Sequence, residues 1–188
     1  MEAYEAITTR RSVPKVSERE PDRDTILRLL HAAVRAPTHH LTQPWRFIVL
    51  RGEALEEFGE AWAHGAAREG KDPSGVRDKA RRAPVVVAVI ERPKSHLPKV
   101  QEIEEHHATG AAIQNLLLAA HADGLGAMLR TGPPAHIPEV LDYLGLEEGE
   151  LVAGYVYVGY PANPQDERPM TRRTDPAEVT EWRGWSSG

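Results

Sequence analysis

The segment PVVVAVI, residues 84–90, constrains the fold more than any other part of the sequence. It is rich in β-branched residues and apolar at every position, so neither side of a strand built from it has a polar face for water. Strands of this kind lie in the interior of a sheet that is covered on both faces. The segment ELVAGYVYVG, residues 150–159, has the same character. The sequence therefore predicts a sheet with helices packed on each side.

Helical and extended patterns alternate along the chain, as such a layered fold requires. The helix after Pro21 shows apolar residues at helical spacing and ends at Pro37. Its predicted apolar stripe consists of Ile26, Leu27, Leu30, Ala33 and Val34. The other predicted helices are 2–9, 53–69, 75–82, 101–123 and 138–146, and the predicted strands are 45–50, 84–90, 124–130 and 150–159.

Two segments suggest burial against another surface. The second half of the helix 101–123, GAAIQNLLLAAHA, is apolar nearly all round and looks too apolar for the surface of a monomer. The stretch 161–188 is polar and irregular, yet it contains Trp182 and Trp185. This extension is either disordered or wraps something, and its tryptophans favour wrapping onto a second subunit. With no repeat or linker, we expect one domain over 1–188, with 161–188 as a C-terminal extension.

Composition excludes several classes of protein. A length of 188 residues is enough to bury a sizeable core, and the formal net charge of −5 argues against a general nucleic-acid binder. The absence of cysteine excludes disulfides, thiolate catalysis and cysteine metal sites. No apolar signal segment and no run long enough to span a membrane is present. We therefore expect a cytoplasmic, soluble protein without nucleic-acid or membrane partners.

The loop RAPTHHLTQPW, residues 35–45, holds more donors and acceptors than a simple connection needs. Two further segments could bind an anion. Arg10, Arg11 and Ser12 can hold a phosphate by charge-assisted hydrogen bonds, although a solvated basic turn explains the same residues. The stretch 130–132, Arg-Thr-Gly, closes a predicted strand and could complete an anion site, or it could simply be the turn that ends the strand.

Other chemistries find little support. The nine histidines include His106 and His107, but no recognised metal-ligand spacing is present, so an ion pair between Glu102 and His106 on one helix face is the better interpretation. Ser12 lies outside any nucleophile-elbow motif. The GLG at 124–126 precedes its strand, whereas a dinucleotide fingerprint follows one.

The order of these motifs resembles one family. From RRS at 10–12 through RAPTHHLTQPW, GAAIQNLLLAAHADGLG, LRTG and GYVYVGYP, the chain is similar to the small members of the FMN-dependent nitroreductase superfamily over most of 3–161. The resemblance implies an α+β, layered α/β fold with a mixed β-sheet flanked by helices. It also implies an intertwined homodimer whose C-terminal extension wraps the partner, with two flavins at the subunit interface.

The resemblance also implies which residues contact the flavin. Arg10, Arg11 and Ser12 match the family segment on the phosphate and ribityl chain. Arg35 and His39 resemble the contacts given by the partner chain, and Gln43 matches the Gln of the same loop. The stretch Leu129, Arg130 and Thr131 is similar to the segment that holds the flavin from the other side.

Two positions depart from the family pattern. Leu41 stands where the broad family has Asn, so a polar contact is lost or moved. Pro14 occupies a position that is often basic, and Lys15 follows it, so a basic group near the flavin pyrimidine would have to come from a shifted register.

The function implied by the resemblance is transfer of a hydride from NADH or NADPH through FMN to an electrophile such as a nitroaromatic, a quinone or an enone. FMN is expected rather than FAD, and the flavin itself carries the chemistry, so we name no catalytic side chain and no metal. The alternative is a flavin carrier or redox sensor without turnover, because the same residues would bind the flavin there. Two further alternatives stay open: oxygen-dependent flavin breakdown or dehalogenation on the same fold, and a metal-dependent hydrolase.

Overall fold

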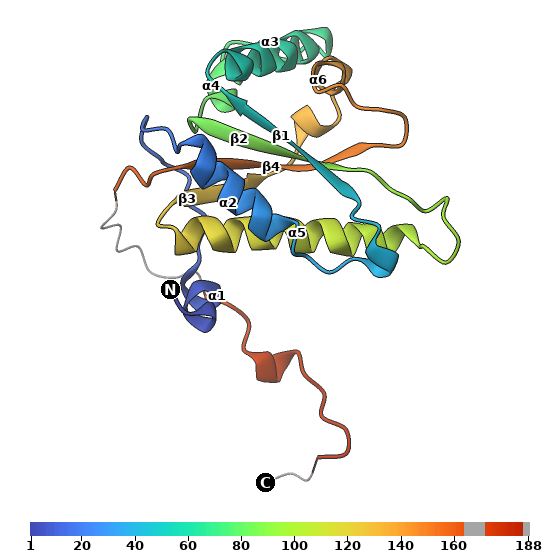
Figure 1. Cartoon of the computed structure of the whole chain (residues 1–188). Helices are drawn as coiled ribbons and strands as arrows, with labels where there is room; N and C mark the ends of the chain where they lie inside the picture. The colour runs from blue at the N-terminus through green and yellow to red at the C-terminus, as the bar shows by residue number, and fades with distance from the viewer. Residues whose placement is uncertain (164–171, 186–188) are drawn as a thin grey trace.

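The computed structural model describes residues 1–163 and 172–185, and its fold is built around one four-stranded sheet (Figure 1). Across the sheet the strands follow the order β1-β2-β4-β3. Their bounds are β1 Trp45–Arg51, β2 Val85–Glu91, β3 Gly126–Arg130 and β4 Leu151–Gly159. All four lie close to their predicted positions, and β2 and β4 are the interior strands.

The strand directions correct one prediction, because all three pairings are antiparallel rather than mixed. The reason lies in the connections. Arg51 at the end of β1 pairs with Val85 at the start of β2. The helices between them therefore leave the sheet and return to the same end of it. A parallel neighbour would need a crossover to the opposite end.

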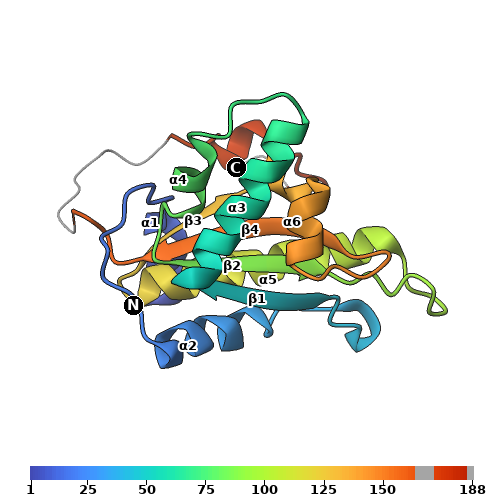
Figure 2. The ribbon, with the colours of Figure 1, turned by 90° about the horizontal axis from the view of Figure 1, so that it is seen from above.

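Helices cover both faces of the sheet. The helices are α1 Ala3–Thr9, α2 Arg23–Ala33, α3 Glu53–Arg68, α4 Val76–Ala80, α5 Glu102–Ala122 and α6 Pro138–Tyr143, with single 3₁₀ turns at η1 His39–Leu41, η2 Pro133–Ala135 and η3 Pro176–Glu178. Figure 2 shows α3 and α6 lying over the strands, with α5 beneath them. We call these two sides the α3 face and the α5 face.

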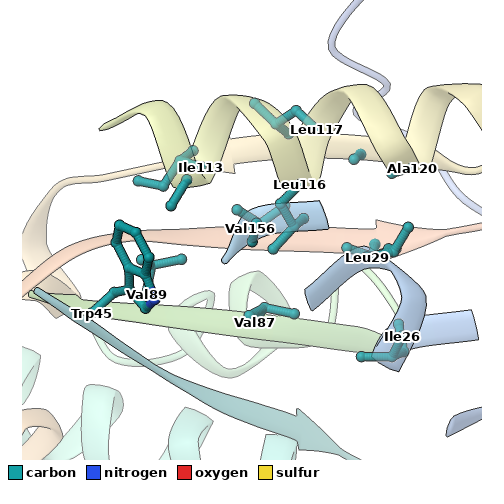
Figure 3. Packing of buried hydrophobic residues seen from close by; sticks show 14 of the residues in the cluster. Ile26, Leu29, Trp45, Val87, Val89, Ile113, Leu116, Leu117, Ala120 and Val156 are labelled. Atoms are coloured by element: carbon teal, nitrogen blue, oxygen red, sulfur yellow. The ribbon is translucent and has the colours of Figure 1, made fainter. Parts of the chain in front are cut away.

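Strand β2 is buried along its whole length, as its sequence predicts. Val85, Val87 and Val89 pack toward α2 and α5, whereas Val86 and Ile90 pack toward α3 and α6. Figure 3 shows the first of these clusters, in which Leu116 of α5 lies over the sheet. Because successive side chains of a strand point to opposite faces of the sheet, β2 contributes to both hydrophobic clusters, which explains why the segment has no polar side.

Two apolar patterns are buried differently from the expectation. In α2, Ile26 and Ala33 are buried as predicted, but Leu27 and Val34 are 42% and 40% exposed, and Leu29 takes the buried position between them. In α5, one side packs against the sheet and α2 of the same chain, which accounts for much of its apolar character.

Residues 172–185 extend away from the body of the molecule (Figure 1). Of the predicted extension, residues 164–171 and 186–188 lie outside the described residues. Trp182 and Trp185 are 67% and 75% exposed, and their ring centroids lie 5.5 Å apart. Among the described residues, no helix is long and apolar enough to cross a membrane.

Candidate functional site

Residues 10–12 lie between the C-terminal end of α5 and the outer edge of β3. The Thr9 hydroxyl forms a 2.8 Å hydrogen bond with Nε2 of His121 on α5. The backbone N–H of Val13 donates to the carbonyl of Ala127 on β3, at 3.1 Å. Arg10 and Arg11 are half-buried and Ser12 is exposed. These contacts fix the basic segment next to β3 in the same chain.

The two guanidiniums change the properties of the neighbouring histidine. Burial, followed by the positive charges of Arg10 and Arg11, lowers the pKa of His121. The imidazole is therefore neutral near pH 7, and the positive charge of this region belongs to the arginines. A neutral imidazole adds hydrogen-bonding capacity without a third charge.

The predicted segment 129–131 ends β3, and its side chains point to different faces of the sheet. Leu129 is paired with Val156 and lies toward the α5 face. Arg130 lies on the α3 face, where its guanidinium carbon is 5.5 Å from the centre of the Tyr157 ring. Gly132 follows with φ 111°, a conformation that a side chain would strain. The backbone of this segment lies by the same strand edge as residues 10–12, but the Arg130 guanidinium is turned away from the face that carries α1.

The loop that contains Arg35, His39 and Gln43 lies at the other end of α5. Arg35 follows α2 and is exposed. Nε2 of His39 is 3.7 Å from Oε1 of Glu104, in the first turn of α5. Gln43, together with the neighbouring residues His40 and Leu41, has positive φ, with values between 48° and 56°. Strained backbone of this kind persists only where the surroundings hold it, and it is concentrated at functional sites.

Buried polar groups hold this strained loop. Nζ of Lys94 donates to the Thr42 carbonyl at 2.6 Å, and the Lys94 backbone N–H donates to the carboxylate of Glu105. Glu105 is 1% exposed. The Thr42 hydroxyl and Oε1 of Glu105 are buried without a hydrogen-bond partner among the described residues. No motif in the sequence indicates these supporting residues.

A second buried carboxylate stands beside them. Oε1 of Glu91, the last residue of β2, lies 2.5 Å from Nδ1 of His106. Burial raises the pKa of Glu91, against the opposing effect of His106. The same imidazole lies 3.6 Å from Glu102, so the predicted pairing of Glu102 and His106 on one helix face is confirmed. A glutamate at the end of an otherwise apolar strand was the one available signal for this cluster.

The two groups of candidate residues are far apart within one chain. His39 contacts α5 at Glu104, whereas Thr9 contacts it at His121. Seventeen residues of helix correspond to about 25 Å at ~1.5 Å per residue. Figure 1 shows α1 and the loop 39–41 at opposite ends of α5. One chain therefore offers two partial sites. Within the described residues, no group of three metal-ligating side chains is present.

Comparison with known proteins identifies the family. The sequence profile of the nitroreductase family matches residues 7–160. The chain belongs to the nitroreductase family. It is 33% identical to the protein named "Putative NAD(P)H nitroreductase YdjA" of Escherichia coli, over 86% of this chain and 89% of that protein.

Solved structures agree with this family assignment. A nitroreductase-like protein from Bacillus cereus superposes with a TM-score of 0.82 at 26% identity, covering 98% of this chain and 97% of the other. A nitroreductase with bound FMN from Bacteroides fragilis gives 0.74 at 26% identity, covering 97% and 99%. The family match includes every candidate residue from Arg10 to Thr131 and ends before the C-terminal extension, residues 161–188.

Proposed function

We propose that this protein is a homodimeric, FMN-dependent oxidoreductase that uses NADH or NADPH to reduce a small electrophilic organic molecule. The main support is the division of the candidate site between the two ends of α5. A flavin held by Arg10, Arg11 and Ser12 could not also touch His39 of the same chain, because about 25 Å of helix separates the two contacts. In a dimer, each flavin site would combine the α1 end of one chain with the loop 35–45 of the other.

The residues at the α1 end fit the phosphate of FMN. Two guanidiniums and a hydroxyl supply charge-assisted and neutral donors, and the fork of an arginine matches phosphate oxygens. The neutral imidazole of His121 adds a hydrogen-bonding group but no further positive charge. Leu129 and Thr131, at the end of β3, would border the flavin through their backbone. The FMN-bound relative from Bacteroides fragilis supports the choice of cofactor.

The loop 35–45 would close the site from the partner chain. His39 and Gln43 are exposed in this chain and have polar groups to offer. The strained backbone of this loop is held by Lys94 and Glu105, so its polar groups are positioned before a ligand arrives. FMN, when bound, supplies the ring that takes a hydride from NADH or NADPH and passes it to a nitroaromatic, quinone or enone.

The dimer also accounts for the exposed apolar groups. The side chains of Trp182 and Trp185 are not packed into the core of this chain. Tyr4 and Ile7 of α1 are 85% and 57% exposed. Exposed aromatic and aliphatic groups of this size are typical of surfaces that a partner covers. In the proposed dimer the C-terminal extension wraps the second subunit.

Mixing two defective variants tests the shared site directly. Arg10→Ala and His39→Ala each damage both sites of their own homodimer. A heterodimer of the two has one doubly defective site and one intact site, so an equal mixture regains about one quarter of the tight FMN sites if subunits exchange at random. No recovery after verified subunit exchange would show that each site lies within one chain. Light scattering at low micromolar concentration checks the dimer itself.

The reaction needs its own assay. Flavin released by heat and identified by chromatography should be FMN, and finding mainly FAD would contradict the proposal. Steady-state oxidation of NADH or NADPH with a quinone acceptor should proceed with the FMN-loaded protein. A loaded protein that fails to turn over with either nucleotide and with quinone or nitroaromatic acceptors would instead support a flavin carrier or redox sensor.

A further inference from the structure

The α3 face holds a cavity beside the proposed flavin site, and the two share only Leu129 and Thr131 at the end of β3. Its volume is about 370 Å³, and its lining comes from α3, from α4 and the turn after it, from the end of β3, from η2 and from β4. The side chains that matter most are Trp62, Lys79, Arg82, Arg130, Tyr155 and Tyr157. This volume is within the usual range for sites that bind small molecules.

The cavity is lined by cations without acidic partners. Lys79, Arg82 and Arg130 all border it, and no aspartate or glutamate does. Among the described residues, none of the three forms an ion pair. The neighbouring arginines behave differently, since Arg77 binds Glu60 at 2.5 Å and Arg81 binds Glu56 at 3.0 Å. Helix α3 therefore carries glutamates that could pair with a cation, yet Glu56 and Glu60 form ion pairs with arginines that do not line the cavity.

Arg130 is the most informative of the three. Its Nε is buried and has no hydrogen-bond partner among the described residues. A buried donor without an acceptor is costly, and each such group in a folded protein calls for an explanation. The guanidinium lies over the Tyr157 ring, at 5.5 Å from its centre, which offsets only part of that cost. A bound anion would supply the missing acceptor.

The walls of the cavity are aromatic. Trp62 is half-buried and comes from α3, while Tyr155 and Tyr157 are buried in β4. The Tyr155 hydroxyl is used, because it donates to the Pro134 carbonyl at 2.9 Å. The Tyr157 hydroxyl has no partner among the described residues and remains available as a donor. Aromatic walls and unpaired cations together favour a ligand with a ring and a negative charge.

We propose that this cavity is a second ligand site, distinct from the flavin site, and that it binds a small aromatic carboxylate. The carboxylate would meet Arg82 and Arg130, with Lys79 adding charge, and the ring would lie against Trp62 and Tyr157. Because the site lies on the α3 face, it does not depend on the flavin assignment of Arg10 or of the loop 35–45. Its position beside Thr131, at the end of β3, sets it next to the strand that is proposed to border the flavin.

Salicylate is a suitable probe, and calorimetry on FMN-saturated protein measures its binding. We expect one salicylate per chain. Salicylamide keeps the ring but loses the charge, and acetate keeps the charge but loses the ring, so both should bind at least ~10-fold more weakly. Arg82→Ala and Arg130→Gln should each weaken salicylate binding by ~10-fold or more, in line with the loss of a charge-assisted contact.

The matched control is Arg81→Ala, which removes the adjacent, ion-paired arginine and should leave salicylate affinity within twofold of the parent protein (~0.4 kcal/mol). Arg82 is exposed, so its substitution should not impair folding. The proposal would be overturned if the Arg82 and Arg130 variants bound salicylate as tightly as the parent protein does. It would also be overturned if the parent protein did not bind salicylate. Salicylate binding that shifts the visible flavin spectrum and survives both substitutions would overturn it as well, because the probe would then lie over the flavin.

Discussion

The two ends of α5 position their neighbouring segments by different means. At the α1 end, a hydrogen bond between Thr9 and His121 and a backbone hydrogen bond from Val13 to Ala127 position the basic segment, whose backbone conformation is ordinary. At the loop end, the buried carboxylate of Glu105 and the ammonium of Lys94 hold backbone with positive φ. Binding groups thus lie on relaxed backbone at one end and on strained backbone at the other.

This difference has a consequence for experiments. A substitution at the α1 end should change flavin affinity with little effect on folding, because Arg10 is only half-buried and Ser12 is exposed. A substitution in the support of the loop should change the free energy of unfolding as well, because it leaves buried polar groups without partners. The ratio of the two effects therefore distinguishes the two ends.

The largest effect is expected from Glu105→Ala. The change removes a carboxylate that is 1% exposed and leaves the Lys94 backbone N–H without its acceptor. The free energy of unfolding should fall by roughly 3 kcal/mol, from the lost charged hydrogen bond and the space left behind. Urea denaturation of the apoprotein measures it. The exposed Glu102→Ala should cost less than ~0.5 kcal/mol. Equal costs would mean that Glu105 does not support the loop.

Arg10→Ala tests the other end. Loss of a charge-assisted contact with the phosphate should weaken FMN binding by ~10- to 150-fold, or roughly 1.5–3 kcal/mol. Unfolding of the apoprotein should change by less than ~0.5 kcal/mol. Fluorescence quenching gives the dissociation constant. Arg10→Lys should recover part of the loss, because lysine keeps the charge but not the planar fork. Arg28→Ala, which removes an exposed ion pair with Asp123 at the same end of α5, is the control.

Arg130 sharpens this comparison. The sequence predicts the same loss for Arg130→Ala as for Arg10→Ala, whereas the orientation of the guanidinium on the α3 face predicts a much smaller one. An FMN affinity within about twofold of the parent protein, or ~0.4 kcal/mol, would agree with the orientation. A loss as large as that of Arg10→Ala would restore the phosphate contact and would count against the second ligand site.

The sequence predicted the elements of the fold well, because hydrophobic periodicity reports burial directly. The buried strand β2 and the long helix α5 are the best examples. The sequence predicted less well which side chains of an element are buried and which are exposed. Leu27 and Val34 fit a helical stripe but are exposed, since a stripe of adjacent apolar residues is wider than the face that α5 and the sheet cover. Strand direction also escaped prediction, because it depends on where the connecting helices return.

The same limit explains what was missed in the candidate site. Motifs marked the segments 10–12, 35–45 and 129–131, but a motif does not say which face of a strand a side chain occupies. Arg130 illustrates this, since its position along β3 was predicted and its direction was not. Glu105 and Lys94 are eleven residues apart and show no spacing that would pair them. Their contact exists only because the chain between β2 and α5 folds back.

A smaller effect is expected for Lys94→Met, which keeps the length of the side chain and removes the ammonium. The Thr42 carbonyl loses its 2.6 Å hydrogen bond, and the cost should be about 1 kcal/mol because the group is only partly buried. Hydrogen exchange should speed up in residues 39–43 and stay unchanged in α1. Lys71→Met, which breaks an exposed pair with Glu69, is the control. Unchanged exchange in the loop would show that Glu105 alone supports it.

The last and smallest effect concerns pH at the loop end. Burial raises the pKa of Glu91 above its ordinary value of 4.5, so the folded protein holds this proton more tightly than the unfolded chain does. The stability that comes from this proton is complete below about pH 4.5 and is lost as the pH rises through the pKa of the folded state. Glu150 has the opposite sign, since its hydrogen bonds with Arg46 lower its pKa, and its contribution to stability is lost as the pH falls.

The free energy of unfolding measured from pH 4.5 to 7 should therefore decline less in Glu91→Gln than in the parent protein. Gln keeps the shape and a hydrogen bond to His106, so packing is preserved. Parallel pH profiles for the two proteins would mean that Glu91 ionises as easily in the folded protein as in the unfolded chain, and the contrast between the ends of α5 would then rest on the strained loop alone.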